Sequence, residues 1–207
     1  MSLSSLTRRH FLLAIAPLLA ACAGGPAARK FSLDPLPASK TQDGARWSLA
    51  IAMPKALKFL DSERIAHRPQ AMELQYYAGA DWVDRAPPML QMLMIRSFQN
   101  RSQLQVAAAD QPGPPPDFLL TTLLQDFQSE RQADGRTSVH IALVASLTRA
   151  RARQTSRDHL IDSRAESADD RIESVVAAFD QALAKAMEEL ITWALSAETL
   201  IPAASRN

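Results

Sequence analysis

Cysteine and histidine, the residue types most often used as metal ligands and as nucleophile or base, are few in this sequence. There are one cysteine and four histidines, Cys22, His10, His67, His140 and His159. A catalytic zinc needs three protein ligands, and a nucleophile needs a neighbouring base. His140 and His159 fall on neighbouring predicted strands and could approach each other, but no third ligand or base is evident near them.

Known catalytic patterns are also missing from the sequence. It contains no G-x-S-x-G elbow, no H-E-x-x-H pair and no glycine-rich phosphate loop. Asp169 and Asp170 stand at the start of a predicted helix, where acids favour the helix dipole, so they are better explained as a helix start than as paired catalytic carboxylates. We therefore predict no catalytic residue, no metal site and no enzyme activity.

The single cysteine lies directly behind a segment typical of exported proteins. Two arginines at residues 8–9 precede residues 11–21, which are apolar apart from one proline. That length suits a signal peptide and is too short for a membrane-spanning helix. The run ends in LAAC at residues 19–22, which resembles the lipobox of bacterial lipoproteins. In that pattern cleavage falls between Ala21 and Cys22. The alternative is an ordinary secretory signal with an unrelated cysteine.

The lipobox resemblance implies that Cys22 is the lipidation site. Its thiol would carry a diacylglyceryl group and its amine an acyl chain such as palmitate, and no other cofactor is expected. Two or three acyl chains anchor durably, because each buried methylene contributes about 0.8 kcal/mol. Ala23 stands where an aspartate often retains lipoproteins at the inner membrane, so the resemblance implies the periplasmic face of a Gram-negative outer membrane. Residues 7–12 (TRRHFL) also resemble a twin-arginine export signal, although a plain basic region explains them equally well.

Composition limits the class of protein. Without residues 1–21 the chain keeps 21 of its 23 basic residues and all 22 acidic residues. No basic block stands out, which argues against a nucleic-acid partner. The 47% of hydrophobic residues is typical of a globular domain. We predict a signal peptide at 1–21, a flexible tether at 22–30 and one domain at 31–200.

Alternating apolar and polar residues predict a sheet. Strands are expected at 31–33, 47–53, 65–67, 72–77, 104–108, 118–127, 138–148 and 155–161. The strand at 118–127 is apolar on both faces, which favours a central position. The sequence ADGR at 133–136 predicts the turn into the next strand. The sequence QPGPPP at 111–116 predicts a stiff, exposed crossing.

Two helices are expected to cover this sheet. Residues 169–195 repeat apolar side chains at helical spacing, which favours packing on a sheet over a lipid-binding face, and Ser167 or Asp169 can cap the start. A second helix at 89–101 follows two prolines and would bury four residues, Leu90, Leu93, Met94 and Phe98. The predicted fold class is therefore α/β of the α+β type. It has a mostly antiparallel sheet with two main helices packed on it in a single domain.

Two apolar residues are candidates for contact with a partner or a lipid. Trp82 precedes the first helix, where tryptophan is more often a core residue than a binding residue. Met92 belongs to a methionine-rich run at 89–94, which suits an adaptable surface or irregular core filling. We retain both as candidate contact residues.

The mature chain resembles the ABC-type transport auxiliary lipoproteins, the group with the paraquat-inducible lipoprotein that accompanies MCE (mammalian-cell-entry) proteins. The resemblance is carried by FSL at 31–33, a strand ending in Pro54, the Leu60-Asp61 step and a basic extended segment at 65–68. It continues with the aromatic pair Tyr76-Tyr77, with Trp82, and with the helix and strand that follow. The prolines at 87–88 and the QPGPPP connector depart from the family pattern.

This resemblance implies a lipid-anchored periplasmic component of an MCE-type ABC transport system that moves lipids or other hydrophobic molecules across the envelope. The implied partners are an MCE-domain protein, an ABC permease, an ATPase and the outer-membrane bilayer. Cys22 is the one site residue that the resemblance carries over. The alternatives are a lipoprotein chaperone or assembly factor for an outer-membrane barrel, and a periplasmic ligand-binding lipoprotein or enzyme.

Overall fold

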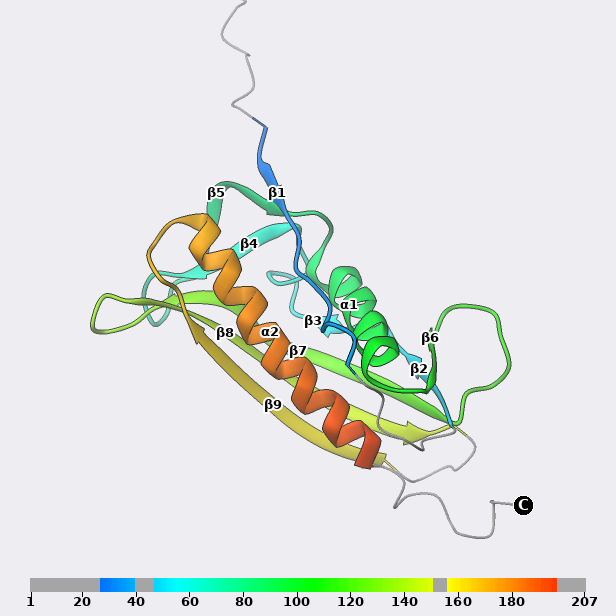
Figure 1. Cartoon of the computed structure of the whole chain (residues 1–207). Coiled ribbons are helices and arrows are strands. Elements are labelled where there is room, and N and C mark those ends of the chain that lie inside the picture. The colour runs from blue at the N-terminus through cyan, green and yellow to red at the C-terminus, as the bar shows by residue number, and fades with distance from the viewer. Residues whose placement is uncertain (1–26, 40–46, 151–155, 197–207) are drawn as a thin grey trace, which may run out of the picture.

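In the part of the chain that the structure describes, two helices pack on one face of a nine-stranded sheet (Figure 1). The computed structural model describes residues 27–39, 47–150 and 156–196. The strands are β1 (Arg29–Phe31), β2 (Ser48–Ile51), β3 (Lys55–Ala56), β4 (Arg64–Arg68), β5 (Gln75–Trp82), β6 (Gln105–Ala108), β7 (Phe118–Arg131), β8 (Thr137–Arg149) and β9 (Ser156–Glu166). The helices are α1 (Ala86–Arg101) and α2 (Ile172–Leu195). The α+β class and the two main helices are therefore confirmed.

Strand β7 is the centre of the sheet, as its two apolar faces predict. On one side, β7 pairs antiparallel with β8 along almost the whole length of β7, and β8 in turn pairs antiparallel with β9. The other edge pairs parallel with β2, β3 and β4 in turn. The sheet is thus mixed, with long antiparallel ladders and short parallel ones. Gly135, with φ of 84°, supplies the left-handed residue of the predicted β7–β8 turn.

Strand β5 bulges away from its neighbour β4. Arg64 pairs with Asp81 and Ala66 with Tyr76, so β5 has extra residues between these two points. Beyond the bulge, β5 pairs parallel with β1, from Arg29 opposite Ala80 onward. The prediction that residues 29–30 belong to a flexible tether is therefore wrong, because their backbone joins the sheet.

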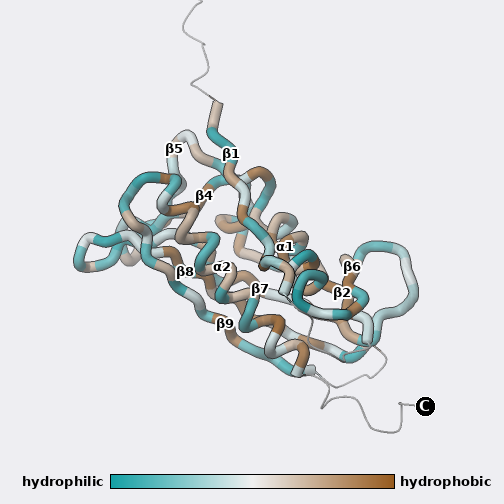
Figure 2. Tube along the Cα trace, viewed as in Figure 1, coloured by the Kyte–Doolittle hydropathy of each residue, from teal (hydrophilic) through white to brown (hydrophobic). Residues whose placement is uncertain are grey.

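The core lies between the helices and the sheet, and Figure 2 shows hydrophobic residues recurring along both. α2 buries the predicted stripe, including Val175, Phe179, Leu183, Met187, Leu190, Ile191 and Ala194. α1 buries all four predicted residues, Leu90, Leu93, Met94 and Phe98. Alanines at 178, 182 and 186 are also buried on α2. Small side chains there let the helix lie close to the strands beneath it.

The start of α2 differs from the prediction. The helix begins at Ile172 rather than at residue 169, and no side chain caps it. Asp169 instead accepts a hydrogen bond of 3.0 Å from the backbone N–H of Arg171. An aspartate that bonds two residues ahead forms an Asx turn, which competes with helix formation. Asp170 forms an ion pair with Arg131 at 2.6 Å. Asp169 and Asp170 therefore stabilise the turn before α2 rather than its first helical residues.

Other boundaries shift by a few residues. β7 continues to Arg131 and β9 to Glu166, four and five residues beyond the predicted ends. The two-residue strand β3 was not predicted, because it is defined only by its pairing with β7. Among the helices of the described residues, none is long and apolar enough to cross a membrane.

Candidate functional site

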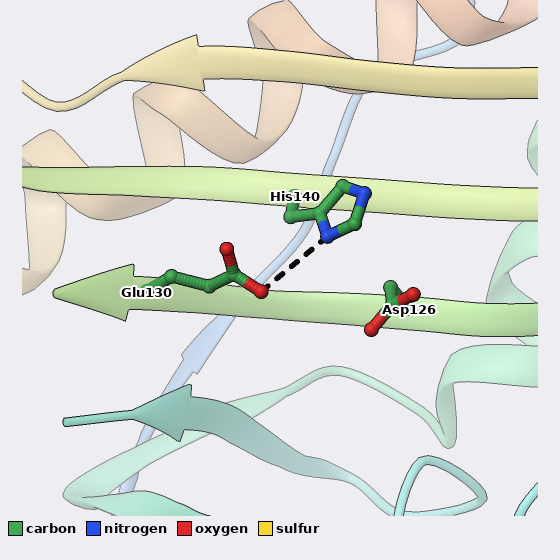
Figure 3. A group of neighbouring side chains, drawn as sticks. All are labelled: Asp126, Glu130 and His140. Atoms are coloured by element: carbon green, nitrogen blue, oxygen red, sulfur yellow. Dashed lines mark hydrogen bonds and ion pairs between the residues drawn. The ribbon is translucent and has the colours of Figure 1, made fainter. Parts of the chain in front are cut away.

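A cluster of ionisable side chains lies on the sheet face that the helices leave open (Figure 3). Asp126 and Glu130 come from β7, and His140 comes from the neighbouring strand β8. Their ligand atoms all lie within 4.8 Å of one another. The side chain of His140 is only 9% exposed. A histidine with two carboxylates is a ligand set that a divalent cation could use.

Both ring nitrogens of His140 already have partners. Nδ1 lies 3.3 Å from Glu130 Oε1, and Nε2 lies 3.0 Å from Asp162 Oδ2 on β9. Arg164 Nη2 lies 3.0 Å and 3.1 Å from the two ring nitrogens. An atom almost equally far from both nitrogens lies over the ring rather than along either lone pair. The ring is therefore held on three sides by charged groups of β7 and β9.

The carboxylates are also engaged. Arg164 Nη1 donates to Glu130 Oε2 at 2.9 Å, and the Arg68 guanidinium lies 3.7 Å from Asp126 and 3.8 Å from Glu130. Gln128 donates to both carboxylates, at 2.7 Å and 3.0 Å. Two arginines thus supply the positive charge that a metal ion would bring. We interpret the cluster as an ion-pair network that joins β4, β7, β8 and β9, not as a cation site.

The electrostatics of Glu130 agree with this interpretation. Its burial would raise the pKa of the carboxyl, because burial disfavours the charged form. Hydrogen bonds from Gln128 and Arg164, together with the charges of His140 and Arg164, outweigh burial and hold the pKa of Glu130 below its usual range. The carboxylate is therefore ionised and stabilises the folded state at neutral pH.

Glu130→Gln should lower the free energy of unfolding at pH 7 by about 1–3 kcal/mol, because Arg164 and Arg68 lose a charged partner. Since the pKa of Glu130 is lower in the folded state, its contribution is present above the unfolded pKa and lost as pH falls through the folded pKa. The difference between the two proteins should shrink below about pH 4. Urea unfolding at several pH values measures it.

The matched control is Glu166→Gln on the same sheet face. Glu166 is 65% exposed and pairs with the exposed Arg136, so the change should stay within about 0.5 kcal/mol. A loss for Glu130→Gln that is no larger than this control, or that does not depend on pH, would contradict the network interpretation.

The other histidines do not join this cluster. His159 lies on the opposite sheet face from His140, where its ring stacks on Trp193 with centroids 5.4 Å apart and Nε2 lies 2.8 Å from Glu189. The approach of His140 to His159, which the sequence left open, does not occur. Their strands are adjacent, but the register places His159 opposite Ala145 and His140 opposite Arg164. Side chains at 140 and 159 therefore point to opposite faces.

A serine–histidine pair escaped the sequence analysis. Ser129 Oγ lies 2.8 Å from His67 Nδ1 and 2.9 Å from the hydroxyl of Tyr77. Burial, followed by the charge of Arg131, lowers the pKa of His67, so its imidazole is neutral at pH 7. A nucleophile and base have this geometry, but Ser129 is fully buried and no substrate could reach it. The pair depends on the long-range pairing of β4 with β7, which no local pattern reveals.

The two candidate contact residues have different surroundings. Trp82 is 1% exposed and packs in the core against Phe127 and Phe179, with ring centroids 5.6 Å and 5.0 Å away. This burial fits the interpretation of Trp82 as a core residue and does not fit a role in contacting a partner or lipid. Met92 is 51% exposed on α1 and is accessible, so its contact role stays a prediction. Ala21 and Cys22 lie outside the described residues.

Residues 31–190 match the family described as the ABC-type transport auxiliary lipoprotein component. The chain belongs to this family. A relative from Bradyrhizobium diazoefficiens, the uncharacterized protein bll6063, is 28% identical over 185 residues, which is 84% of the chain. The chain spans about half the length of that relative, 47%.

Solved structures share the fold of this chain. The crystal structure of protein XCC0632 from Xanthomonas campestris is 26% identical, has a TM-score of 0.69, and is matched over 83% of this chain and 98% of its own. A crystal structure of an uncharacterized protein is 12% identical, with a TM-score of 0.64 over 82% and 99% of the two chains. The second likeness shows the fold alone.

Proposed function

We propose that this protein is the lipid-anchored envelope component of an ABC-type transport system that moves lipids or other hydrophobic molecules. The observation that carries the proposal is the family match over residues 31–190. In this proposal an acylated Cys22 holds the domain at the periplasmic face of the outer membrane. The domain docks an MCE-type protein, while a permease and an ATPase elsewhere supply the energy.

A non-catalytic role is supported by the chemistry of the described side chains. The polar cluster of β7 and β8 is neutralised by arginines, and the serine–histidine pair is closed to substrate. A docking domain needs neither a metal-binding cluster nor an accessible nucleophile. It needs a rigid fold and a fixed position at a membrane, which a mixed sheet with a large core and a lipid anchor would provide.

Lipid exchange between the two membranes tests this function. In cells that lack the protein, newly labelled lipids should move between inner and outer membranes at a changed rate, measured by separating the membranes after a pulse of labelled precursor. The wild-type chain should restore the rate, and Cys22→Ser should not. An unchanged rate for every lipid class in the deleted strain would contradict the lipid-transport proposal.

A further inference from the structure

The turn between β4 and β5, residues 69–74, carries two exposed apolar side chains. Met72 is 101% exposed, more than any other large hydrophobic residue in the described part of the chain, and Leu74 is 44% exposed. Single exposed apolar residues are common on protein surfaces. A fully exposed one at the tip of a turn is less usual, because turns favour small and polar residues and apolar surface is costly to keep in water. The turn therefore presents an apolar tip to whatever lies beside it.

Hydrogen bonds and a ring contact hold this tip away from the domain. The backbone N–H of Glu73 donates to the carbonyl of Gln70 at 3.1 Å, which closes a turn with Met72 at its tip. Shortly after the turn, the Tyr76 ring stacks on Phe59 with centroids 4.3 Å apart, and the Tyr76 hydroxyl donates to the Phe59 carbonyl at 2.9 Å. Met72 therefore projects from a fixed base.

The lipid anchor would leave the domain on the same side as this turn. β1 pairs parallel with β5, with Arg29 opposite Ala80. Because the two strands run in the same direction, the chain before Arg29 leaves the sheet at the end where β5 enters it. Followed backwards from Ala80, β5 leads through its bulge to Gln75, the first residue after the turn. Figure 1 shows β1 and β5 together at one end of the molecule and β6 at the other.

The anchor and the turn can reach one membrane. The chain from Cys22 to Arg29 spans at most about 25 Å when fully extended, and the chain from Met72 to Ala80 spans at most about 28 Å. Arg29 and Ala80 are paired, so the two segments start from neighbouring points. An acylated Cys22 would therefore hold the end of the domain that carries the turn close to the bilayer surface.

The charges around the anchor exit are balanced. Arg29 pairs with Glu173 at 2.6 Å, and Lys30 pairs with Glu63 at 2.6 Å. Glu73 is the one charged residue within the turn, and it is negative. Anionic lipids attract clusters of uncompensated lysines and arginines, which the paired Arg29 and Lys30 do not form. This surface therefore suits zwitterionic lipid, with contact through apolar side chains.

We infer that the tip of the β4–β5 turn enters the interface of a zwitterionic phospholipid bilayer, the membrane that holds the anchor. Met72 and Leu74 would lie at the boundary between head groups and acyl chains. With the anchor at β1, this second contact fixes how the domain stands, and it directs β6, at the opposite end of the strand order, away from the membrane. The inference rests on the proposed function, since it needs an acylated Cys22.

A polarity-sensitive fluorophore on Met72→Cys tests the inference in the full lipidated chain, reconstituted in phosphatidylcholine vesicles. Acylation blocks the thiol of Cys22, so the introduced cysteine is the one that reacts. The emission should lie at shorter wavelength than that of the unacylated Cys22→Ser chain in solution, and lipids brominated on their acyl chains should quench it. The matched control is Ala107→Cys, at an exposed position of the edge strand β6, which should show neither effect. Equal behaviour of the two labels would overturn the inference.

Met72→Ser combined with Leu74→Ser should release this orientation while the anchor stays in place. Energy transfer from a fluorophore on Ala107→Cys to acceptor lipids should rise, because β6 is no longer held away from the bilayer. Met53→Ser with Leu160→Ser is the matched control, since it changes the same two residue types at positions that are 44% and 57% exposed, and it should leave the transfer unchanged. Thermal unfolding checks that both variants fold. Unchanged transfer in the turn variant would contradict the inference.

Further outcomes assign a failure to its cause. If the intact mass shows acyl groups but the label at residue 72 stays in water, the inference is wrong and the anchor of the proposed function stands. If the mass shows no acyl groups, the inference and the anchor are both wrong. If the label shifts in concentrated Cys22→Ser protein without vesicles, a second copy of the chain covers the turn, which also overturns the inference.

Discussion

Cys22→Ser should move the protein from the membrane fraction to the soluble periplasmic fraction almost completely. The expected effect is large because two or three acyl chains would be lost together. Each buried methylene contributes about 0.8 kcal/mol to anchoring, so no surface contact of the domain could replace them. The described helices offer no substitute, since none is long and apolar enough to cross a membrane.

Membrane fractionation and the intact mass of the purified protein measure this effect. The wild-type protein should begin at residue 22 and carry the added mass of its acyl groups. The matched control is Ala27→Ser, which adds the same hydroxyl beyond the lipobox and should stay on the membrane. A Cys22→Ser protein that remains membrane-bound, with a wild-type protein of unmodified mass, would contradict the lipoprotein assignment of this cysteine.

Phe179→Ala should have the largest effect on stability. Phe179 is fully buried at the centre of an aromatic cluster, edge-on to Trp82 at 5.0 Å and 5.1 Å from Phe127. It joins α2 to the sheet and to the end of β5. Removing a buried phenylalanine costs about 3–5 kcal/mol through lost burial and the cavity left behind. Domains of this size are stable by only about 5–15 kcal/mol, so much of the total would be lost.

Urea unfolding followed by circular dichroism measures this loss. Gln181→Ala, two residues further along the same helix on its exposed side, is the control and should change stability by less than about 0.5 kcal/mol. A loss below about 1 kcal/mol for Phe179→Ala would mean that the helix is not held to the sheet by this cluster.

Local patterns predicted the elements of this fold well. The apolar repeat of α2 extends over six turns, so its helical period and its buried face were both readable. The two-sided apolar character of β7 predicted its central place, and the ADGR turn predicted the β7–β8 hairpin. Trp82 shows where local patterns are insufficient, because its residue type and position were compatible with both a core residue and a contact residue.

The parallel pairings could not be predicted from the sequence. β2, β3 and β4 all join the same edge of β7, although they lie 50 or more residues before their partners in the chain. Such pairings depend on the whole topology and not on any local run of residues. The contacts of Arg68 with Asp126 and Glu130 and the contact of His67 with Ser129 all depend on the β4–β7 register. The sequence analysis therefore found the histidines but not their partners.

Affinity capture of the tagged lipoprotein from native membranes, read by mass spectrometry, tests the proposed transport role most directly. We predict recovery of an MCE-domain protein together with an ABC permease and its ATPase, with the Ala27→Ser control recovering the same set. Cys22→Ser run beside them shows whether docking needs the anchor. Recovery of a single outer-membrane barrel in equal amount, without transport subunits, would contradict the account in favour of an assembly factor. Recovery of no transport subunit at all would contradict it in favour of a free-standing binding protein.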